Sequence, residues 1–385
     1  MTNPISLAEI ATITSGKRPA LVEKEPTESL RVPVIGGGGV SGFTDKALYE
    51  GNILVTGRVG TLGKLFSPDG PCWPSDNTLV IFPKDSRTDF RFLRYALQAQ
   101  IADAVGMNRG AANPLITQKD LGTFVIRRLP LPEQRAIAAV LGALDDKIAL
   151  NRRMNATLEG MARALFRDLF VDFGPTRAKQ AGQPPYLAPG LWSLFPARLD
   201  GEGKPEGWEM RRVDQFMELA YGKALRAADR KIGPVPVYGS GGITGQHSEA
   251  LVPGPSIIIG RKGTVGSLFW EDRPFFPIDT VFYVRPLVPL AFCYYALETL
   301  GLDHMNTDAA VPGLNRNNVY RLEVPWPGDD LVKAFDQFAG SIRARIRHNN
   351  GESRTLAQTR DLLLPRLMSG ELRVAKAEAL AGEVV

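Results

Sequence analysis

The sequence has few of the residues that build disulfides and metal centres. Its 385 residues contain two cysteines, Cys72 and Cys293, and three histidines, His247, His304 and His348. Neither cysteine has a metal-ligand partner at suitable spacing, so we expect neither a disulfide framework nor a zinc site. The histidines also lack partners at ligand spacing, and we interpret them as ordinary polar or surface residues.

Long apolar runs and an export signal are also missing. No apolar run reaches the roughly 18 residues needed to cross a bilayer, and residues 1–20 lack a basic segment followed by an apolar one. With so few cysteines, this predicts a cytoplasmic protein without membrane contact. The hydrophobic content of 44% is typical of globular domains. The net charge of +5 is compatible with DNA binding but does not demonstrate it.

The chain contains two copies of one plan. Residues 32–76 align with residues 235–279 without a gap, and 21 of the 45 pairs are identical. Outside this stretch, Ser15-Gly16-Lys17 corresponds to Tyr221-Gly222-Lys223. Each copy has strand and turn signals punctuated by glycine and proline, and then a long helical segment. A duplicated domain is the simplest explanation.

The two helical segments have the heptad pattern of a coiled coil. From Pro132 the chain runs about 40 residues without another proline. Apolar residues repeat at alternating spacings of four and three, which predicts a partner helix. The first seam comprises Ile137, Leu141, Leu144, Ile148, Asn151, Asn155, Leu158, Ala162, Leu165 and Leu169. The second comprises Phe335, Phe338, Ile342, Ile346, Asn349, Leu356, Leu363 and Leu367.

Antiparallel pairing of these helices inside the chain would bring Asn151 and Asn349 together, so we predict that they set the register. A helix of about 40 residues is about 60 Å long. The pair would therefore hold the two copies apart as a ruler, related by an approximate two-fold axis. Alternatively, each helix covers its own globule and the asparagines face water.

The predicted fold class is α/β (α+β): two duplicated domains separated by two long antiparallel coiled-coil helices. The predicted boundaries follow the repeat and the composition. They are 1–130 for the first domain, 131–173 for the first helix, 174–207 for a linker, 208–327 for the second domain, 328–373 for the second helix and 374–385 for a tail.

Three segments resemble motifs of enzymes or of nucleotide-binding proteins, but each departs from its motif at an essential position. Gly37, Gly39 and Gly42 have dinucleotide-binding spacing, but serine replaces the first glycine in the second copy. The segment 57–64, GRVGTLGK, has five residues between glycines where a P-loop has four, and the second copy also lacks its lysine. Residues 183–186, QPPY, mimic a methyltransferase tetrapeptide but begin with glutamine and lie in the linker. We therefore predict no catalytic residues and no metal site.

Basic residues near the glycine loops are the candidate DNA contacts. Tight glycine turns let a backbone approach a surface closely, and lysine and arginine neutralise phosphates. The loops at 107–114 and 307–316 add Asn, Arg and Thr, which contact bases and phosphates, although ordinary polar loops remain the alternative. The candidates are Lys17, Arg18, Arg58, Lys64, Arg109, Lys223, Arg226, Arg261, Lys262 and Arg316.

Several stretches carry a family resemblance that covers residues 5–373. The most specific is 129–173, LPLPEQRAIAAVLGALDDKIALNRRMNATLEGMARALFRDLFVDF. Weaker support comes from 14–19, the paired glycine loops, 205–209 and 311–315. The chain resembles the DNA-specificity subunits of type I restriction-modification systems.

This resemblance implies two target-recognition domains that each read half of a bipartite, asymmetric target in double-stranded DNA. It implies a scaffold for two adenine-methylating modification subunits, which restriction subunits join. S-adenosylmethionine, ATP and Mg²⁺ would then belong to those partners. We expect Glu133, Gln134 and Arg135 to contribute to partner docking. The second copy reads PWPGDD at 325–330 where the first reads PLPEQR, which argues against symmetric docking.

Two other classes remain open. One is an enzyme with an unrecognised site, for example a nuclease that uses Asp76 and Asp279 with neighbouring arginines. The other is a coiled-coil interaction scaffold without DNA recognition. Salt-dependent DNA binding by the assembled complex would exclude the second.

Overall fold

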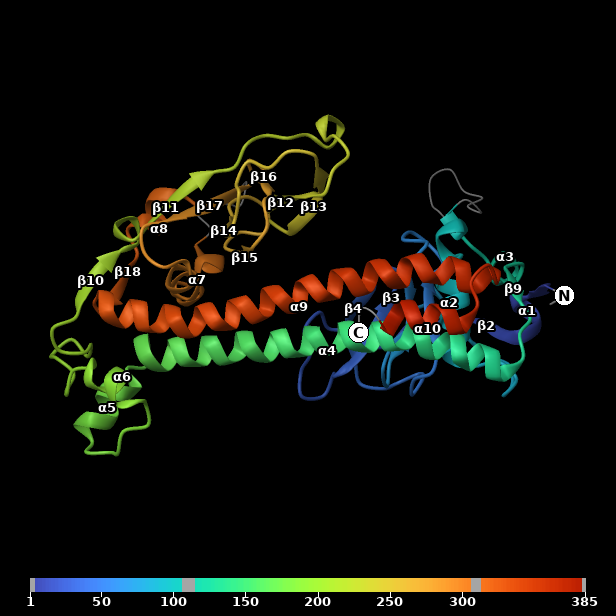
Figure 1. Cartoon of the computed structure of the whole chain (residues 1–385), viewed down its shortest axis with the longest axis horizontal. Coiled ribbons are helices and arrows are strands. Elements are labelled where there is room, and N and C mark those ends of the chain that lie inside the picture. The colour runs from blue at the N-terminus through green and yellow to red at the C-terminus, as the bar shows by residue number, and fades with distance from the viewer. Residues whose placement is uncertain (1–3, 106–114, 306–312, 383–385) are drawn as a thin grey trace. The chain divides into compact units, whose positions relative to one another are not determined.

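A computed structural model describes residues 4–105, 115–305 and 313–382 (Figure 1). The chain divides into two compact units, which each contain one copy of the repeat. Unit 1 comprises Met1–Asn151 and Gly351–Val385, and unit 2 comprises Arg152–Asn350. Both boundaries fall inside long helices, so each unit contains one part of each helix.

Unit 1 contains three sheets with the strand orders β1-β9, β2-β8-β5-β6 and β4-β3-β7. Its strands are β1 (Pro4–Ser6), β2 (Ala11–Ser15), β3 (Val32–Gly36), β4 (Gly39–Thr44), β5 (Leu54–Gly57), β6 (Leu65–Phe66), β7 (Trp73–Pro74), β8 (Thr78–Pro83) and β9 (Val125–Arg127). Its helices are α1 (Leu7–Ile10), α2 (Phe90–Gln98), η1 (Ile101–Val105), α3 (Gln118–Gly122), α10 (Val374–Gly382) and parts of α4 (Leu131–Phe170) and α9 (Asp329–Ser369).

Unit 2 repeats these three sheets in the same order, as β10-β18, β11-β17-β14-β15 and β13-β12-β16. Its strands are β10 (Glu209–Arg212), β11 (Met217–Tyr221), β12 (Val235–Gly239), β13 (Gly242–His247), β14 (Ser256–Gly260), β15 (Leu268–Glu271), β16 (Phe276–Pro277), β17 (Val281–Pro286) and β18 (Glu323–Trp326). Its other elements are α5 (Gly174–Gln180), α6 (Pro189–Ser193), η2 (Val213–Gln215), η3 (Ala227–Asp229), α7 (Leu290–Thr299), η4 (Leu302–His304) and α8 (Arg316–Tyr320).

The strand registers of the two units also correspond. Ser15 at the end of β2 pairs with Leu79, and Tyr221 at the end of β11 pairs with Phe282. In both units the register shifts at the same step of the β3-β4 or β12-β13 hairpin. The predicted duplication of an α/β domain is therefore confirmed.

The helices α4 and α9 pack against each other within each unit, and their contacts run antiparallel. In unit 1, Asp145 pairs with Arg360 at 2.6 Å, and Lys147 pairs with Glu352. In unit 2, Arg343 pairs with Glu159 at 2.6 Å. The buried seam residues of both helices join the sheet and the short helices in one large hydrophobic cluster per unit, and a smaller cluster packs among the strands of each unit. The paired long helices are confirmed.

One predicted seam residue is wrong. Phe338 is 36% exposed, whereas its neighbour Ala339 is fully buried. The buried positions are Phe335, Ala339, Ile342, Ile346 and Asn349, whose spacings alternate between four and three throughout. The large side chain of Phe338 suggested a core position, but the heptad phase places the smaller alanine there.

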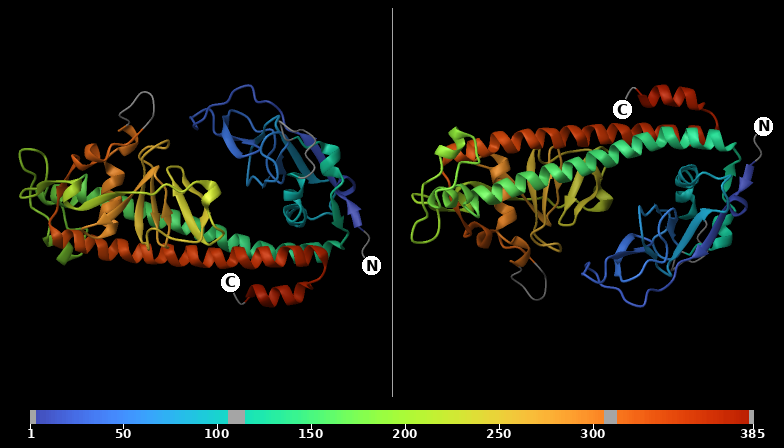
Figure 2. Two further views of the ribbon diagram at one scale, coloured as in Figure 1. Left: turned by 90° about the horizontal axis from the view of Figure 1, so that it is seen from above. Right: turned by 90° about the horizontal axis from the view of Figure 1, so that it is seen from below.

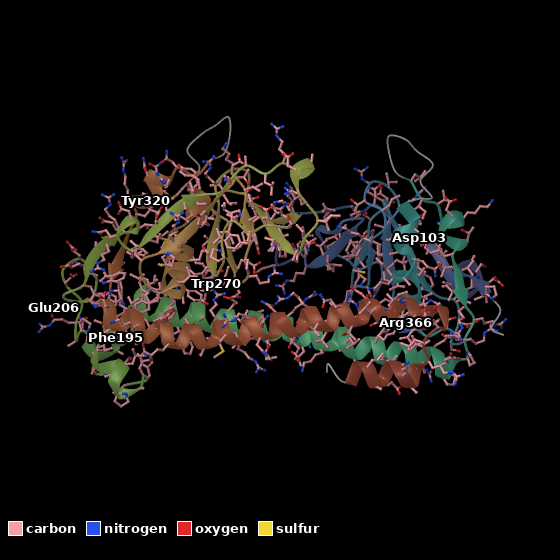
Figure 3. All side chains as sticks on the ribbon, turned by 45° about the horizontal axis from the view of Figure 1, so that its top comes forward. Asp103, Phe195, Glu206, Trp270, Tyr320 and Arg366 are labelled. Atoms are coloured by element: carbon pink, nitrogen blue, oxygen red, sulfur yellow. The ribbon has the colours of Figure 1, made fainter. Side chains whose placement is uncertain are left out.

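The segments predicted as a linker and as a tail both contain helices. The predicted tail forms α10, which lies beside α9 and buries Ala377 and Ala381 in the core of unit 1 (Figure 2). The predicted linker contains α5 and α6, and its Phe195, which is labelled in Figure 3, packs against Trp208 in the core of unit 2. The high proline and glycine content of the linker concealed these short helices.

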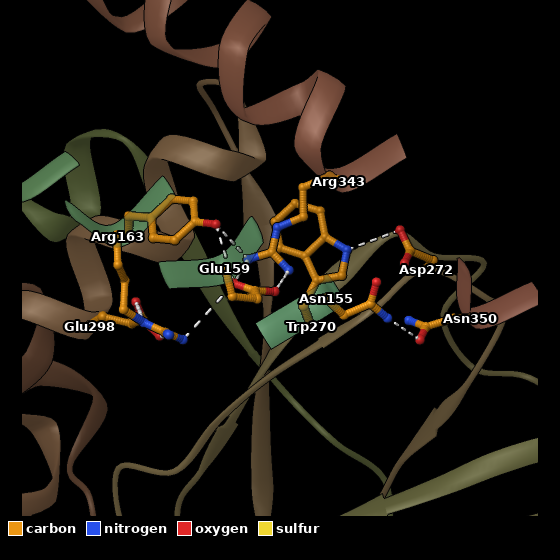
Figure 4. Close-up of polar contacts among 9 residues, drawn as sticks. Asn155, Glu159, Arg163, Trp270, Asp272, Glu298, Arg343 and Asn350 are labelled. Atoms are coloured by element: carbon orange, nitrogen blue, oxygen red, sulfur yellow. Dashed lines mark hydrogen bonds and ion pairs between the residues drawn. The ribbon is translucent and has the colours of Figure 1, made fainter. Parts of the chain in front are cut away.

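A buried charged cluster attaches the sheet of unit 2 to both long helices (Figure 4). Arg343 on α9 donates to Glu159 on α4 and to the hydroxyl of Tyr295 on α7. Its guanidinium also lies 4.3 Å from the ring centre of Trp270 on β15. Burial raises the pKa of Tyr295, so its hydroxyl stays protonated. In unit 2 α4 supplies the acid and α9 the base, whereas unit 1 has one ion pair of each polarity, so the two helices carry complementary charges in both units.

Removing the Arg343 side chain is expected to destabilise unit 2 strongly. Its side chain is 8% exposed, and Arg343→Ala would leave Glu159 without its buried partner. Breaking a buried pair in this way costs about 3 to 5 kcal/mol. Urea unfolding followed by tryptophan fluorescence measures the loss, because four of the five tryptophans lie in unit 2. The exposed Arg345→Ala on the same helix is the control, and equal losses for both variants would contradict this account.

Candidate nucleic-acid interface

In each unit the four-stranded antiparallel sheet brings three loops together at one end of its strands. In unit 1, β2 ends at Ser15, β8 begins at Thr78 and β5 ends at Gly57, and the strand pairing places these three residues side by side. The segments that leave these strand ends include 16–18, 58–64 and 75–77. These segments contain most of the predicted DNA contacts of the first copy.

The same backbone hydrogen bonds hold these loops in both units. In unit 1, Arg58 N donates to Asn77 O at 2.8 Å, and Ile116 N donates to Arg58 O at 3.0 Å. In unit 2, Arg261 N donates to Thr280 O at 2.9 Å, and Leu314 N donates to Arg261 O at 2.8 Å. The two arginines therefore occupy equivalent and rigidly held positions.

The loop after β5 or β14 requires glycine. A Cβ atom on Gly57 would lie 1.9 Å from Thr61 O, and one on Gly260 would lie 2.0 Å from Thr264 O. Gly60 and Gly263 have φ values of +79° and +85°, which favour glycine. The motif that resembles a P-loop is thus a tight turn between two strands, and it presents the arginine beside it.

An open groove of about 630 Å³ lies along these loops in unit 1. Its lining includes Arg18, Gly37, Gly38, Thr61 and Asn77. Backbone and small side chains dominate this surface, so a flat or convex polar ligand can approach closely.

In unit 2 two arginines converge on one exposed tyrosine ring. The guanidinium carbons of Arg261 and Arg316 lie 5.1 Å and 4.9 Å from the ring centre of Tyr221, which is 49% exposed. Arg316 also lies 5.6 Å from the ring of Tyr320, and its Nη1 donates to Leu219 O at 3.5 Å. Two like charges beside one exposed ring create a site that favours an anion or a base edge.

None of the nine described candidates forms an ion pair within the described ranges 4–105, 115–305 and 313–382. Arg58, Arg261 and Arg316 are half-buried, and Lys17, Arg18, Lys64, Lys223, Arg226 and Lys262 are exposed. Their positive charges are therefore available to phosphates. Arg109 lies outside the described residues.

Comparison with known proteins identifies the family. The family model described as "Type I restriction modification DNA specificity domain" matches residues 2–160 and again residues 205–338, more than half of the chain. The chain belongs to this family. As a specificity subunit it is the non-catalytic DNA-recognition component of a type I restriction-modification system.

Curated relatives and a solved structure agree with this assignment. The chain is similar to the "Type I restriction enzyme HindI specificity subunit" of Haemophilus influenzae, 24% identical over 70% of this chain and 73% of that protein. It is also similar to the MjaIX specificity subunit of Methanocaldococcus jannaschii, 21% identical over 87% of this chain and 83% of the other. The fold matches the crystal structure of an S subunit from M. genitalium at a TM-score of 0.54 and 19% identity, covering 96% of each chain.

The three residues expected to contribute to partner docking differ in how accessible their side chains are to a partner. Gln134 is buried, its amide nitrogen donates to Arg87 O and Leu129 O, and its oxygen accepts from Asp89 N. It therefore fastens the start of α4 to its own domain and offers no group to a partner. Glu133 pairs with Arg127 at 3.6 Å, and Arg135 is exposed.

The start of α9 is built differently, in line with the sequence change at 325–330. Trp326 is buried against Phe216 and Phe292, and Arg211 stacks on its ring at 4.2 Å. An aromatic core contact thus replaces the polar anchor that Gln134 provides in unit 1.

The two asparagines of the helix seams are buried, and each bonds across the helix pair within its own unit. Asn151 Nδ2 donates to Glu352 Oε2 at 2.7 Å in unit 1. Asn349 Nδ2 donates to Asn155 Oδ1 at 2.8 Å in unit 2. Both bonds satisfy polar groups that would otherwise be costly inside an apolar seam.

Among the described residues, no group of three or more His, Cys, Asp or Glu side chains could hold a metal ion. Asp76 and Asp279, which the nuclease alternative invoked, are exposed residues two positions before the first residue of β8 or β17. Within those same ranges, no helix is long and apolar enough to cross a membrane.

Sequence reasoning did not single out three residues that the structure places at these loops, namely Ser15, Gln118 and Tyr221. Ser15 and Tyr221 were recognised as equivalent, but neither was taken as a contact residue. Gln118 occupies the place in α3 that Arg316 occupies in α8. Extending the repeat alignment to these short helices would have identified it.

Proposed function

We propose that this specificity subunit reads a bipartite, asymmetric target in double-stranded DNA, with each unit contacting one half. The observation that supports this most is the duplicated loop framework, which carries the same arginine twice among otherwise different side chains. Equal frameworks suit the same DNA backbone, and different side chains suit two different base sequences. The predicted basic contacts, Arg109 included, belong to this proposal.

We further propose that the paired helices α4 and α9 set the length of the unread spacer and that Asn151 and Asn349 fix their register. Two modification subunits would bind this scaffold in the cytoplasm, and restriction subunits would join them. Glu133 and Arg135 remain our candidates for docking. S-adenosylmethionine for adenine methylation, and ATP with Mg²⁺ for restriction, would be bound by the partners.

Purification of the chain with its cognate modification subunit tests this assembly. We expect a complex of one specificity chain with two modification subunits, which transfers methyl groups from S-adenosylmethionine to adenine in DNA. The isolated chain should transfer none. Methylation by the isolated chain, or a failure of the two proteins to associate, would contradict the proposal.

A further inference from the structure

The two units share one loop framework but differ in several side chains around it. Arg58 and Arg261 are equivalent and unchanged. Around them Ser15 is replaced by Tyr221, Leu79 by Phe282, and Gln118 by Arg316. The first two correspondences follow from the strand register.

The equivalence of Gln118 and Arg316 follows from the backbone. Both are the first residue of a five-residue helix, α3 or α8. Each helix begins two residues after the residue that donates to the carbonyl of Arg58 or Arg261, namely Ile116 or Leu314. The two side chains therefore start from the same place in the framework.

In unit 1 this position carries an uncharged side chain, Gln118. The amide nitrogen of Gln118 donates to Ser15 Oγ at 3.1 Å, which orients the amide. Its carbonyl oxygen and second N–H remain available at an exposed position. An acceptor beside a donor is the pair that matches N6 and N7 of adenine.

In unit 2 the same position carries a planar cation. Arg316 is held by the rings of Tyr221 and Tyr320 and by the carbonyl of Leu219. This support restricts the guanidinium plane, and N–H groups of both Nη atoms remain available. Two parallel donors match O6 and N7 of guanine.

We propose that Gln118 and Arg316 are base-reading residues at equivalent positions, with Gln118 selecting adenine in one half-site and Arg316 selecting guanine in the other. This assignment rests on the proposed function. The unchanged pair Arg58 and Arg261 contacts phosphates, which are the same in every sequence. A position that changes from amide to guanidinium while its framework is preserved instead suits the reading of different bases.

Substitutions that exchange the two side chains test the assignment. In complexes with the modification subunit, Arg316→Gln should replace a required guanine by adenine at one position of one half-site. Gln118→Arg should make the reverse change in the other half-site. We expect each preference to shift by roughly ten- to hundredfold, measured by mapping methyladenine and by binding to oligonucleotides with single base changes.

Two further variants separate base reading from charge and folding. Arg316→Lys keeps the charge but loses the planar pair of donors, so the salt dependence should persist while discrimination against adenine falls several-fold. Arg321→Gln makes the same chemical change at an exposed position next to α8 and should leave the motif unaltered.

If Arg316→Gln weakened DNA binding equally for all sequences, the assignment would be overturned, because Arg316 would then be a phosphate contact. A split motif that stays the same in both the Arg316→Gln and the Gln118→Arg variant would also overturn the assignment, but it would leave the proposed function intact. Wild-type methylation that follows no split motif would instead contradict the proposed function itself.

Discussion

Inserting seven residues into each long helix, after Asn151 in α4 and after Asn350 in α9, is expected to lengthen the unread spacer of the target by about three base pairs. Seven residues add about 10 Å of helix at 1.5 Å per residue, and one base pair occupies 3.4 Å of duplex. Seven residues also complete nearly two turns, so the heptad phase is preserved. The complex should therefore stop methylating the wild-type motif and methylate the same two half-sites across a longer gap.

The insertion points keep both units intact, because they coincide with the unit boundaries. The bonds of Asn151 with Glu352 and of Asn155 with Asn350 each lie within one unit and are preserved. The same seven residues placed in the exposed turn at Gly201–Gly203 serve as the control and should leave the spacer unchanged. If the variant with insertions in both α4 and α9 kept the wild-type spacer, the helices would not set the spacer length.

Replacing Arg58 and Arg261 together by alanine is expected to weaken DNA binding by about a hundredfold at 0.1 M salt. Each lost phosphate contact forgoes the release of about one counterion, which is worth roughly tenfold in affinity at this salt concentration. The slope of log affinity against log salt should therefore become shallower by about two. Binding of the assembled complex to its target over a salt titration measures both quantities.

Two comparisons make this result specific. Arg31→Ala removes an exposed arginine just before β3, at the opposite end of that strand from the glycine turn, and should change neither affinity nor slope. The single variants Arg58→Ala and Arg261→Ala should each give half of the change in slope. A wild-type slope in the double variant would remove these arginines from the interface.

The duplicated fold could be predicted because repetition and heptad spacing are direct properties of the sequence. The uninterrupted correspondence of 32–76 with 235–279 identified the two domains, and the spacing from Ile137 onward predicted α4. Phe338 is a position that heptad spacing and residue size did not predict correctly. Residue size favoured a core position for the phenylalanine, but the phase of the helix, fixed by packing on both sides, placed Ala339 there.

The interface could be predicted only in part. The loops were found because glycine patterns mark tight turns, and Arg58 and Arg261 lie within those patterns. Tyr221 and Gln118 were not singled out because the residues that they contact, Arg316 and Ser15 respectively, are distant in sequence. Gln134 looked available for docking because it is polar at the start of an exposed helix, but tertiary packing buries its amide.

The central claim is that each unit reads its own half of the target. Mapping methyladenine across the genome of a methylation-free host that carries this chain and its modification subunit tests it most directly. We expect one motif with two different specified halves and a gap of fixed length without base preference. A continuous motif, or two halves with identical sequence, would contradict it.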